Sequence, residues 1–358
     1  MRLAIIGAGP IAGLSAMLAS QRGHEVALWS PRGAPRLGEA EDGWLRFACT
    51  GALEGGAEVA LLPDARALAD WPVLLIAIPA NAYAPVLTPI LPLLGAGRTV
   101  ICGGALSLLP LWLAERGGGA DIVAWGTTLG TGRILPDRSL QVGTVRARFE
   151  QAALPAARAE ALLALNTALF GDRFARADSL LVPLLSNINP VAHAGQVIPN
   201  MARMDKAEPW QLFANFTAAG ARIAEAIDAE RIAIAAAFGA TVRSLAAHYH
   251  LSYHVPLGPV DAIAAAIEAA GRGPRGPTSF RHRYMEEDMP FGLVVYEALG
   301  RIAGVPTPMT SAAVTLLSAA TGQDFRAQNP ILEALALEGM TPAALVARCG
   351  GERITGPG

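Results

Sequence analysis

Residues 2 to 13 read R-L-A-I-I-G-A-G-P-I-A-G, and this stretch decides the fold that we expect for the first half of the chain. The apolar run before the glycines predicts a buried strand, and the residues after them have the composition of a helix. Gly7 allows a tight turn, Gly9 lets a ligand approach the backbone, and the small Ala12 lets the helix pack on a sheet. The pattern predicts a dinucleotide site with the pyrophosphate at the helix N-terminus.

Short apolar runs and helical segments alternate from this start to about residue 125, which is typical of a parallel sheet with helices on both faces. After about residue 178, Ala, Leu and Ile recur at helical spacing, which predicts helices only. We therefore expect an α/β plus all-α protein, with a Rossmann-type doubly wound parallel sheet in residues 1–178 and an α-helical domain in residues 179–358. Predicted strands cover residues 2–6, 25–29, 73–78, 99–102 and 122–125, with antiparallel strands within 140–153 and a helix over 155–170.

Composition excludes several classes of protein. The 358 residues carry a net charge of -2 and are 52% hydrophobic, so neither a nucleic-acid surface nor a basic membrane surface is expected. Residues 73–97 lack charges, but four prolines make one membrane-spanning helix a poor interpretation. Cys49, Cys102 and Cys349 stand singly, which indicates a reducing, cytoplasmic setting and no thiolate metal cluster. No bound metal is expected.

The end of the second predicted strand, A-L-W-S-P-R, bears on the choice of dinucleotide. An NAD site usually has an acidic residue there to bind the ribose 2′-hydroxyl. Here Ser30 and Arg32 offer a hydroxyl and a cation, which suit a 2′-phosphate, and Arg36 could serve in place of Arg32. NADP is therefore favoured over NAD.

The first of two polar blocks is S-N-I-N-P-V-A-H, residues 186–193. Pro190 suits the first turn of a helix, which makes Asn189 a candidate N-cap. His193 lies four residues further, on roughly the same side, and its polar neighbours suggest proton transfer near the junction of the two domains. For Asn189, capping and substrate contact are equally acceptable readings; for His193, the alternative is a core histidine.

The second polar block is R-H-R-Y-M-E-E-D, residues 281–288. The guanidinium of Arg283 is suited to bind a substrate carboxylate through two parallel hydrogen bonds. One of the three acids could orient the histidine and stabilise its imidazolium form. Spacing alone does not choose among Glu286, Glu287 and Asp288, and a solvated charge run is the alternative.

Taken together, the blocks resemble the opine dehydrogenase family along nearly the whole chain. The resemblance rests on the glycine loop, N-x-N-x-x-x-H at 187–193, D-A-E-R-I-A-I-A at 228–235, R-Y-x-x-E-D at 283–288 and G-x-x-x-x-V-P-T-P at 300–308. It implies that His193 and Asp288 form a proton-transfer dyad, with Arg283 and Asn189 binding substrate. It further implies NAD(P)-dependent condensation of an amino acid with a 2-oxo acid such as pyruvate, and a homodimer. Ser30 departs from the acidic ribose ligand of NAD-using relatives.

Two other functions fit the same features. A ketopantoate-like or other 2-oxo or hydroxy acid reductase would typically need a catalytic lysine, and Lys206 is the single lysine of the chain. A non-catalytic NADP-binding protein would leave the two polar blocks unexplained. The histidines of H-Y-H-L-S-Y-H, which are His248, His250 and His254, could line a pocket, but their spacing fits a shared metal poorly.

Overall fold

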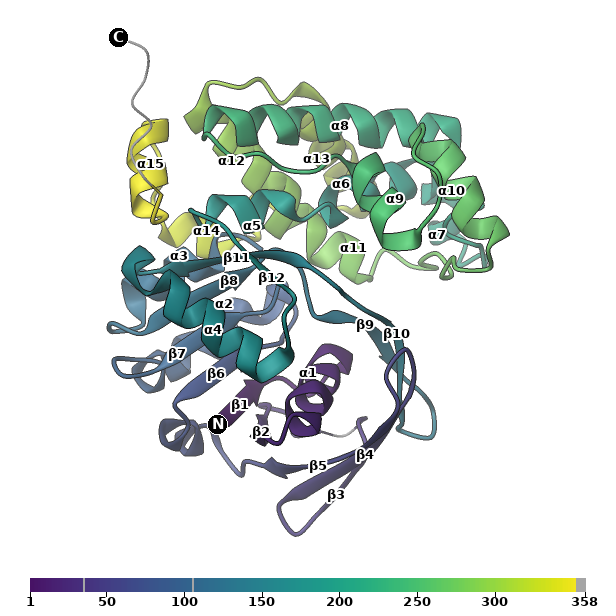
Figure 1. Ribbon diagram of the computed structural model, residues 1–358. Helices are drawn as coiled ribbons and strands as arrows, with labels where there is room; N and C mark the ends of the chain where they lie inside the picture. The colour runs from purple at the N-terminus through teal and green to yellow at the C-terminus, as the bar shows by residue number, and fades with distance from the viewer. Residues whose placement is uncertain (35, 105, 352–358) are drawn as a thin grey trace. The chain divides into compact units, whose positions relative to one another are not determined.

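The computed structural model describes residues 1–34, 36–104 and 106–351, and their contacts divide the chain into two units (Figure 1). The first unit comprises Met1–Leu184 together with the residues from Ala347 to Gly351. The second comprises Leu185–Val346. The sequence placed the division after residue 178 and assigned the C-terminal residues to the helical domain. In the structure the division falls within α5 (Leu181–Ser186), and the last described residues group with the first unit.

The first unit is built on a mixed sheet whose central strands are parallel. Their order is β5-β2-β1-β6-β7-β8, in which the chain starts in the middle and adds strands on both sides. This order defines a Rossmann-type sheet and confirms the predicted fold class. The bounds are β1 Arg2–Ile6, β2 Glu25–Trp29, β5 Gly55–Leu61, β6 Val73–Ile76, β7 Thr99–Cys102 and β8 Asp121–Trp125.

Additional strands extend the sheet at both edges. On one side β4 pairs antiparallel to β5, and β3, β10 and β9 follow; on the other side β11 and β12 follow β8. The predicted strands within residues 140–153 therefore exist, but β10 and β11 lie at opposite edges. The bounds are β3 Glu39–Glu41, β4 Trp44–Gly51, β9 Gly130–Ile134, β10 Leu140–Val145, β11 Phe149–Leu154 and β12 Phe174–Arg176.

Helices α1 (Pro10–Gln21) and α4 (Ala159–Phe170) contact each other and cover one face of this sheet. The aromatic centre of that core is Trp125, whose ring packs against Phe149, Phe170 and Phe174. The uncharged stretch after β6 forms short pieces: η2 Ala80–Ala82, α2 Tyr83–Leu87 and η3 Thr88–Leu93. Across the described residues, none of the helices has both the length and the apolar character needed to span a bilayer. The remaining helices are η1 Ala65–Asp70, α3 Leu109–Arg116 and η4 Ala156–Arg158.

The second unit is helical, and its longest described helix is α8 (Ala218–Ala237) (Figure 1). Helices α6, α10, α12 and α13 all contact α8, which therefore forms the centre of this unit. The bounds are α6 Asn189–Val197, η5 Ile198–Asn200, α7 Met201–Asp205, α9 Leu245–Tyr253, α10 Val260–Ala269, α11 Arg283–Glu286, the π-helical turn η6 Met289–Leu293, α12 Val294–Ala303, α13 Pro308–Thr321, η7 Phe325–Ala327, α14 Pro330–Ala334 and α15 Pro342–Arg348.

A buried ion pair on α8 ties three segments of the second unit together. Arg231 is fully buried and donates through Nε and Nη2 to Oδ1 of Asp228, at 2.9 and 2.7 Å. It also donates to the carbonyls of Leu185 and Arg243, while Oδ2 of Asp228 accepts from the N–H of Leu245. Both charged groups of the pair thus have hydrogen-bond partners, as buried charges require. The pair holds the segment that leads into α6.

Replacing Arg231 with Met should destabilise the protein strongly, because it leaves the Asp228 carboxylate buried without its cation. We expect the free energy of unfolding in urea to fall by about 3–5 kcal/mol. The control is Arg46→Met, since Arg46 pairs with Glu58 in an exposed position and should be almost neutral. Equal effects of the two variants would contradict this account of the buried pair.

Candidate active site

Gly7 forms the turn at the end of β1, and its backbone conformation and close surroundings leave no room for a side chain at this position. Its φ is +136°, and its N–H donates to the carbonyl of Trp29 at 2.7 Å. A Cβ added here would lie 2.3 Å from the carbonyl oxygen of Ala77. The predicted tight turn is therefore present where β1 lies between β2 and β6, at the carboxyl ends of the parallel strands.

Gly9 is the N-cap of α1, and the helix has no side-chain cap. A Cβ at Gly9 would meet nothing within 4 Å, so open space lies beside the first turn. Ala12 is fully buried, in agreement with close packing of the helix on the sheet. Free amide donors, the helix dipole and open space together fit the pyrophosphate of a dinucleotide.

The residues expected near the ribose follow β2. Ser30 is half-buried, and its Oγ accepts from the N–H of Arg32 at 3.4 Å. The side chains of Arg32 and Arg36 are exposed. The structure thus has a hydroxyl and two exposed cations just past the end of this strand, and either arginine is accessible to an anionic ligand.

His193 and Asp288 form a buried hydrogen bond in the second unit. The distance between Nδ1 of His193 and Oδ2 of Asp288 is 2.6 Å, although the residues are 95 positions apart in the chain. Asp288 is 1% exposed and His193 is 8% exposed, so solvent competes little for this bond. Of the three acids that the sequence left open, Asp288 is the one that contacts the histidine, and it is not part of a solvated charge run.

Close packing of α6 on its neighbours positions His193. Gly195 faces α8, where an added Cβ would lie 2.6 Å from the carbonyl of Gly220 and 2.7 Å from Cβ of Ala224. On the other side of α6, Pro190 lies against Gly292 of η6, the turn that follows Asp288. Close contacts at two glycines, with a neighbouring carbonyl, a Cβ and a rigid proline ring, therefore position both partners of the dyad.

The start of α6 differs from the prediction. Ile188 is the N-cap and Asn189 is the first helical residue, so the expectation that Asn189 caps the helix is wrong. Asn187 supplies the side-chain oxygen instead, because its Oδ1 accepts from the N–H of Asn189 at 3.0 Å. The carbonyl of Asn187 in turn accepts from the hydroxyl of Tyr296 at 2.8 Å. The side chain of Asn189 is thereby released from capping, and the residue is half-buried.

Burial lowers the pKa of His193 below its ordinary value, and nearby Arg283 lowers it further, whereas the carboxylate of Asp288 acts in the opposite direction. The imidazole is therefore neutral at pH 7. Because a carboxylate only accepts, the proton of the neutral ring belongs on Nδ1, facing Asp288. Nε2 then carries a lone pair and is the nitrogen able to take up a proton.

Arg283, on α11, is suited to meet an anion. Its side chain is 56% exposed, and its ion pair with Glu287 is long, at 3.7 Å between Nε and Oε1. Such a loose pair leaves guanidinium donors free to bind a carboxylate in parallel hydrogen bonds. Two residues of the second polar block thus have different surroundings: Asp288 contacts the histidine, whereas Arg283 is exposed to solvent.

Sequence reasoning missed three aromatic and polar residues: Tyr284, which contacts the dyad, and Gln196 with its partner Tyr249. The ring of Tyr284 stacks on the imidazole of His193, with centroids 3.4 Å apart and planes 16° apart. Gln196, three residues after His193 on α6, is buried and lies 3.5 Å from the hydroxyl of Tyr249. The signal for Gln196 was its helical spacing from His193, and Tyr284 stood next to Arg283 in the second polar block.

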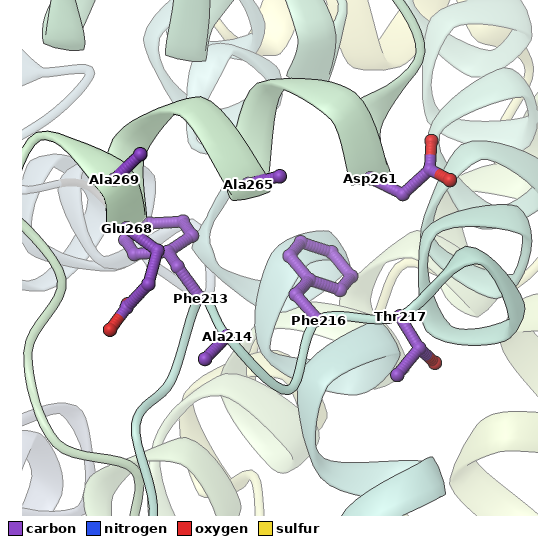
Figure 2. Close-up of a pocket in the computed structure, with 8 residues that line it drawn as sticks. All are labelled: Phe213, Ala214, Phe216, Thr217, Asp261, Ala265, Glu268 and Ala269. Carbon is purple, nitrogen blue, oxygen red and sulfur yellow. The ribbon is translucent and has the colours of Figure 1, made fainter.

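A separate hollow of about 470 Å³ lies in the second unit (Figure 2). The rings of Phe213 and Phe216 lie beside the face of α10 that carries Asp261 and Glu268. The ring of Phe213 also packs edge-on against Tyr249. The hollow does not include either member of the dyad, and its lining is Phe213, Ala214, Phe216, Thr217, Asp261, Ala265, Glu268 and Ala269.

The remaining candidates from the sequence fall outside the dyad. Lys206 is exposed just after α7, so it lacks the burial that would prepare a lysine for catalysis. In the described part of the chain, no group of histidines, cysteines and acids has the arrangement of a metal site. His250 uses Nδ1 to bind the carbonyl of Val255 at 2.6 Å, and His254 is exposed with a left-handed backbone.

Comparison with known proteins defines the class. A family model described as NAD/NADP octopine/nopaline dehydrogenase, alpha-helical domain, matches residues 176–321. The chain belongs to the opine dehydrogenase family, whose members are NAD(P)-dependent oxidoreductases acting on CH–NH groups. The resemblance seen in the sequence is thereby confirmed.

Three relatives make the comparison specific. An opine dehydrogenase from Arthrobacter sp. (strain 1C) is 32% identical over 96% of this chain and 97% of its own length. Octopine dehydrogenase solved with NADH and L-arginine has a TM-score of 0.75 at 17% identity, covering all of both chains. Yersinopine dehydrogenase with NADP⁺ bound has a TM-score of 0.69 at 15% identity, covering 98% of each chain. The two solved structures share the fold of this protein.

The 2.6 Å bond predicts a particular NMR signature in the cofactor-free protein. His193 should be neutral at pH 7 and protonated on Nδ1, with that proton resonating far downfield because the bond is short and charge-assisted. Asp288→Asn should remove the downfield resonance, whereas Glu287→Gln should preserve it. A neutral His193 protonated on Nε2 in the unmodified protein would show that the dyad is arranged differently.

Proposed function

We propose that this chain catalyses the NAD(P)H-dependent reductive condensation of an amino acid with a 2-oxo acid such as pyruvate, and the reverse oxidation. The buried bond between His193 and Asp288 carries the proposal, because it gives a neutral histidine a fixed tautomer and a counter-charge for its protonated form. Membership of the opine dehydrogenase family supports the reaction type.

The proposed mechanism gives each residue of the second unit a task. Nε2 of His193 accepts the proton that the ammonium group of the amino acid releases, and the free amine attacks the keto carbon. The attacking nitrogen then passes a proton to the former keto oxygen, which becomes a hydroxyl. The imidazolium returns this proton to the hydroxyl of the adduct, which leaves as water and gives a protonated imine. Asp288 holds the ring and stabilises its charged form. Arg283 anchors a substrate carboxylate, and Asn189 provides a second polar contact.

The cofactor in this proposal is bound by the first unit. Gly7, Gly9 and Ala12 would hold the pyrophosphate at the start of α1, where the open space beside Gly9 leaves room for it. When bound, the reduced nicotinamide supplies the hydride that converts the protonated imine to a secondary amine. Ser30 and Arg32 favour NADP, although relatives have been solved with either NADH or NADP⁺.

The same proposal extends to the setting of the enzyme. All three cysteines are buried and free, which suits a cytoplasmic protein. We further propose a homodimer assembled through the helical unit, in keeping with the family resemblance. Amino acid and 2-oxo acid are the expected small-molecule partners. Size-exclusion chromatography with light scattering measures the assembly directly.

The decisive experiment is an assay of NADPH and NADH oxidation with pyruvate and other 2-oxo acids, each combined with the common amino acids. We expect oxidation that requires both substrates and yields a secondary amine product detectable by mass spectrometry. Oxidation with a 2-oxo acid alone would instead identify a hydroxy acid dehydrogenase. The absence of turnover with every pair, despite cofactor binding, would contradict the proposed reaction.

Replacing His193 with Asn should lower kcat by about 10²- to 10⁴-fold, because the reaction loses its proton carrier. The affinity for NADPH, measured by fluorescence titration, should stay within about twofold. His254→Asn is the matched control, since His254 is exposed and Asn tolerates its left-handed backbone. Retention of more than a tenth of kcat in His193→Asn would refute its assignment as the acid and base.

Arg32→Ala tests the cofactor preference. Loss of a charge-assisted contact with the 2′-phosphate should raise KM for NADPH about tenfold and leave KM for NADH unchanged. Arg36→Ala tests the second exposed cation. If Arg36 is the ligand of the 2′-phosphate, this variant, and not Arg32→Ala, should raise KM for NADPH. A parallel rise for both cofactors would argue against 2′-phosphate recognition by either residue.

A further inference from the structure

The rings of Tyr284 and His193 form a close, face-to-face contact. The two centroids are 3.4 Å apart and the planes are nearly parallel, at 16°. The rings come from different elements, since His193 lies on α6 and Tyr284 on α11. The two elements are in contact at this point, so the stack is part of their packing.

The hydrogen bond to Asp288 does not by itself restrain every motion of the imidazole. It fixes the Nδ1 side of the ring, but the ring plane can still tilt about this bond, and Nε2 then changes direction. A ring stacked face to face at 3.4 Å opposes that tilt, because any rotation drives the edges of the rings together. Since proton transfer needs a short and well-directed contact, the direction of Nε2 affects the rate.

We propose that Tyr284 is a positioning residue for His193, which holds the plane of the imidazole and stabilises its protonated form. The face of a tyrosine ring attracts a cation placed over it, and this attraction acts on imidazolium but not on neutral imidazole. The contact therefore strengthens as His193 takes up its proton. The inference rests on the proposed proton-transfer role of His193 and adds a residue to it.

Tyr284 is itself held in place. Its N–H donates to Nδ1 of His282 at 3.4 Å, and the ring of His282 meets the tyrosine ring edge-on at 4.5 Å and 88°. Burial raises the pKa of Tyr284 to about 12, so the phenol stays neutral at pH 7. Burial also lowers the pKa of His282 to about 4, so this ring is neutral as well. Both rings that flank this site are therefore uncharged, and Tyr284 meets the imidazole with the face of a neutral ring.

The groups that face His193 can be assigned by element. Asp288, just before η6, favours the imidazolium, whereas Arg283 on α11 disfavours it; neighbouring His282 is neutral. Helix α8 faces α6 at Gly195 with the small residues Gly220 and Ala224. Burial opposes the charge on His193 most strongly. The ring of Tyr284 thus assists Asp288 in offsetting burial, from the face of the imidazole instead of its edge.

The test compares Tyr284→Phe, which keeps the ring, with Tyr284→Leu, which keeps apolar bulk without it. In cofactor-free protein, NMR reports the Cε1 proton of His193, which an aromatic ring above the imidazole shifts upfield. We expect that upfield shift to persist in the Phe variant and to disappear in the Leu variant. The pKa of His193 should fall in the Leu variant and stay unchanged in the Phe variant.

In the turnover assay, Tyr284→Leu should lower kcat about tenfold with KM for NADPH unchanged, and Tyr284→Phe should retain kcat. Tyr284→Met supplies a second non-aromatic variant if the Leu variant does not fold. An unshifted Cε1 proton in the unmodified protein, or equal loss in the Phe and Leu variants, overturns the inference. The NMR readout does not depend on substrate, so absence of turnover with all substrates would refute the proposed reaction while leaving the stack measurable.

Discussion

The hydrogen bond between His193 and Asp288 is the interaction on which the proposed chemistry of this protein depends. Its length of 2.6 Å joins residues 95 positions apart, and both are withdrawn from water. A short bond between residues so far apart in the chain requires that the two backbone segments be held close together. Contacts at Gly195 and Gly292 provide that fixation, because neither position has room for a side chain. The buried pair on α8 secures the segment that precedes α6.

Burial has opposing effects at this site. It makes the imidazole hard to protonate, which keeps the ring neutral at pH 7, as the proposed base role requires. Burial also destabilises the protonated ring. The carboxylate of Asp288 at the edge of the ring offsets this effect, and we propose that the tyrosine on its face does so as well. Asp288 has one oxygen, Oδ1, that is buried without a hydrogen-bond partner in the described residues. Its hydrogen bonding is therefore concentrated on the histidine.

Some features of the fold and of the site can be predicted from the sequence and others cannot, for physical reasons. Strands β1, β2 and β7 have their predicted bounds because they are buried on both faces and end at glycines or polar residues. Strand β4 was missed although Leu45, Phe47 and Cys49 alternate with exposed residues, so its period-2 signal was available. Capping was one of two readings for Asn189, because local rules allow it, but the side-chain oxygen that accepts at the helix start comes from Asn187. Stacking on His193 depends on packing between α6 and α11, which no local pattern encodes.

The discontinuity of the first unit constrains how the chain acquires its structure during synthesis. The N–H of Leu180 donates to the carbonyl of Cys349, and Arg348 forms an ion pair with Glu115. These contacts join the sheet unit to residues that the ribosome produces after the entire helical unit. A nascent chain that has reached residue 184 therefore lacks part of its first unit. Maturation of the sheet unit must be completed after translation has passed the helices, so the order of synthesis and the order of folding differ.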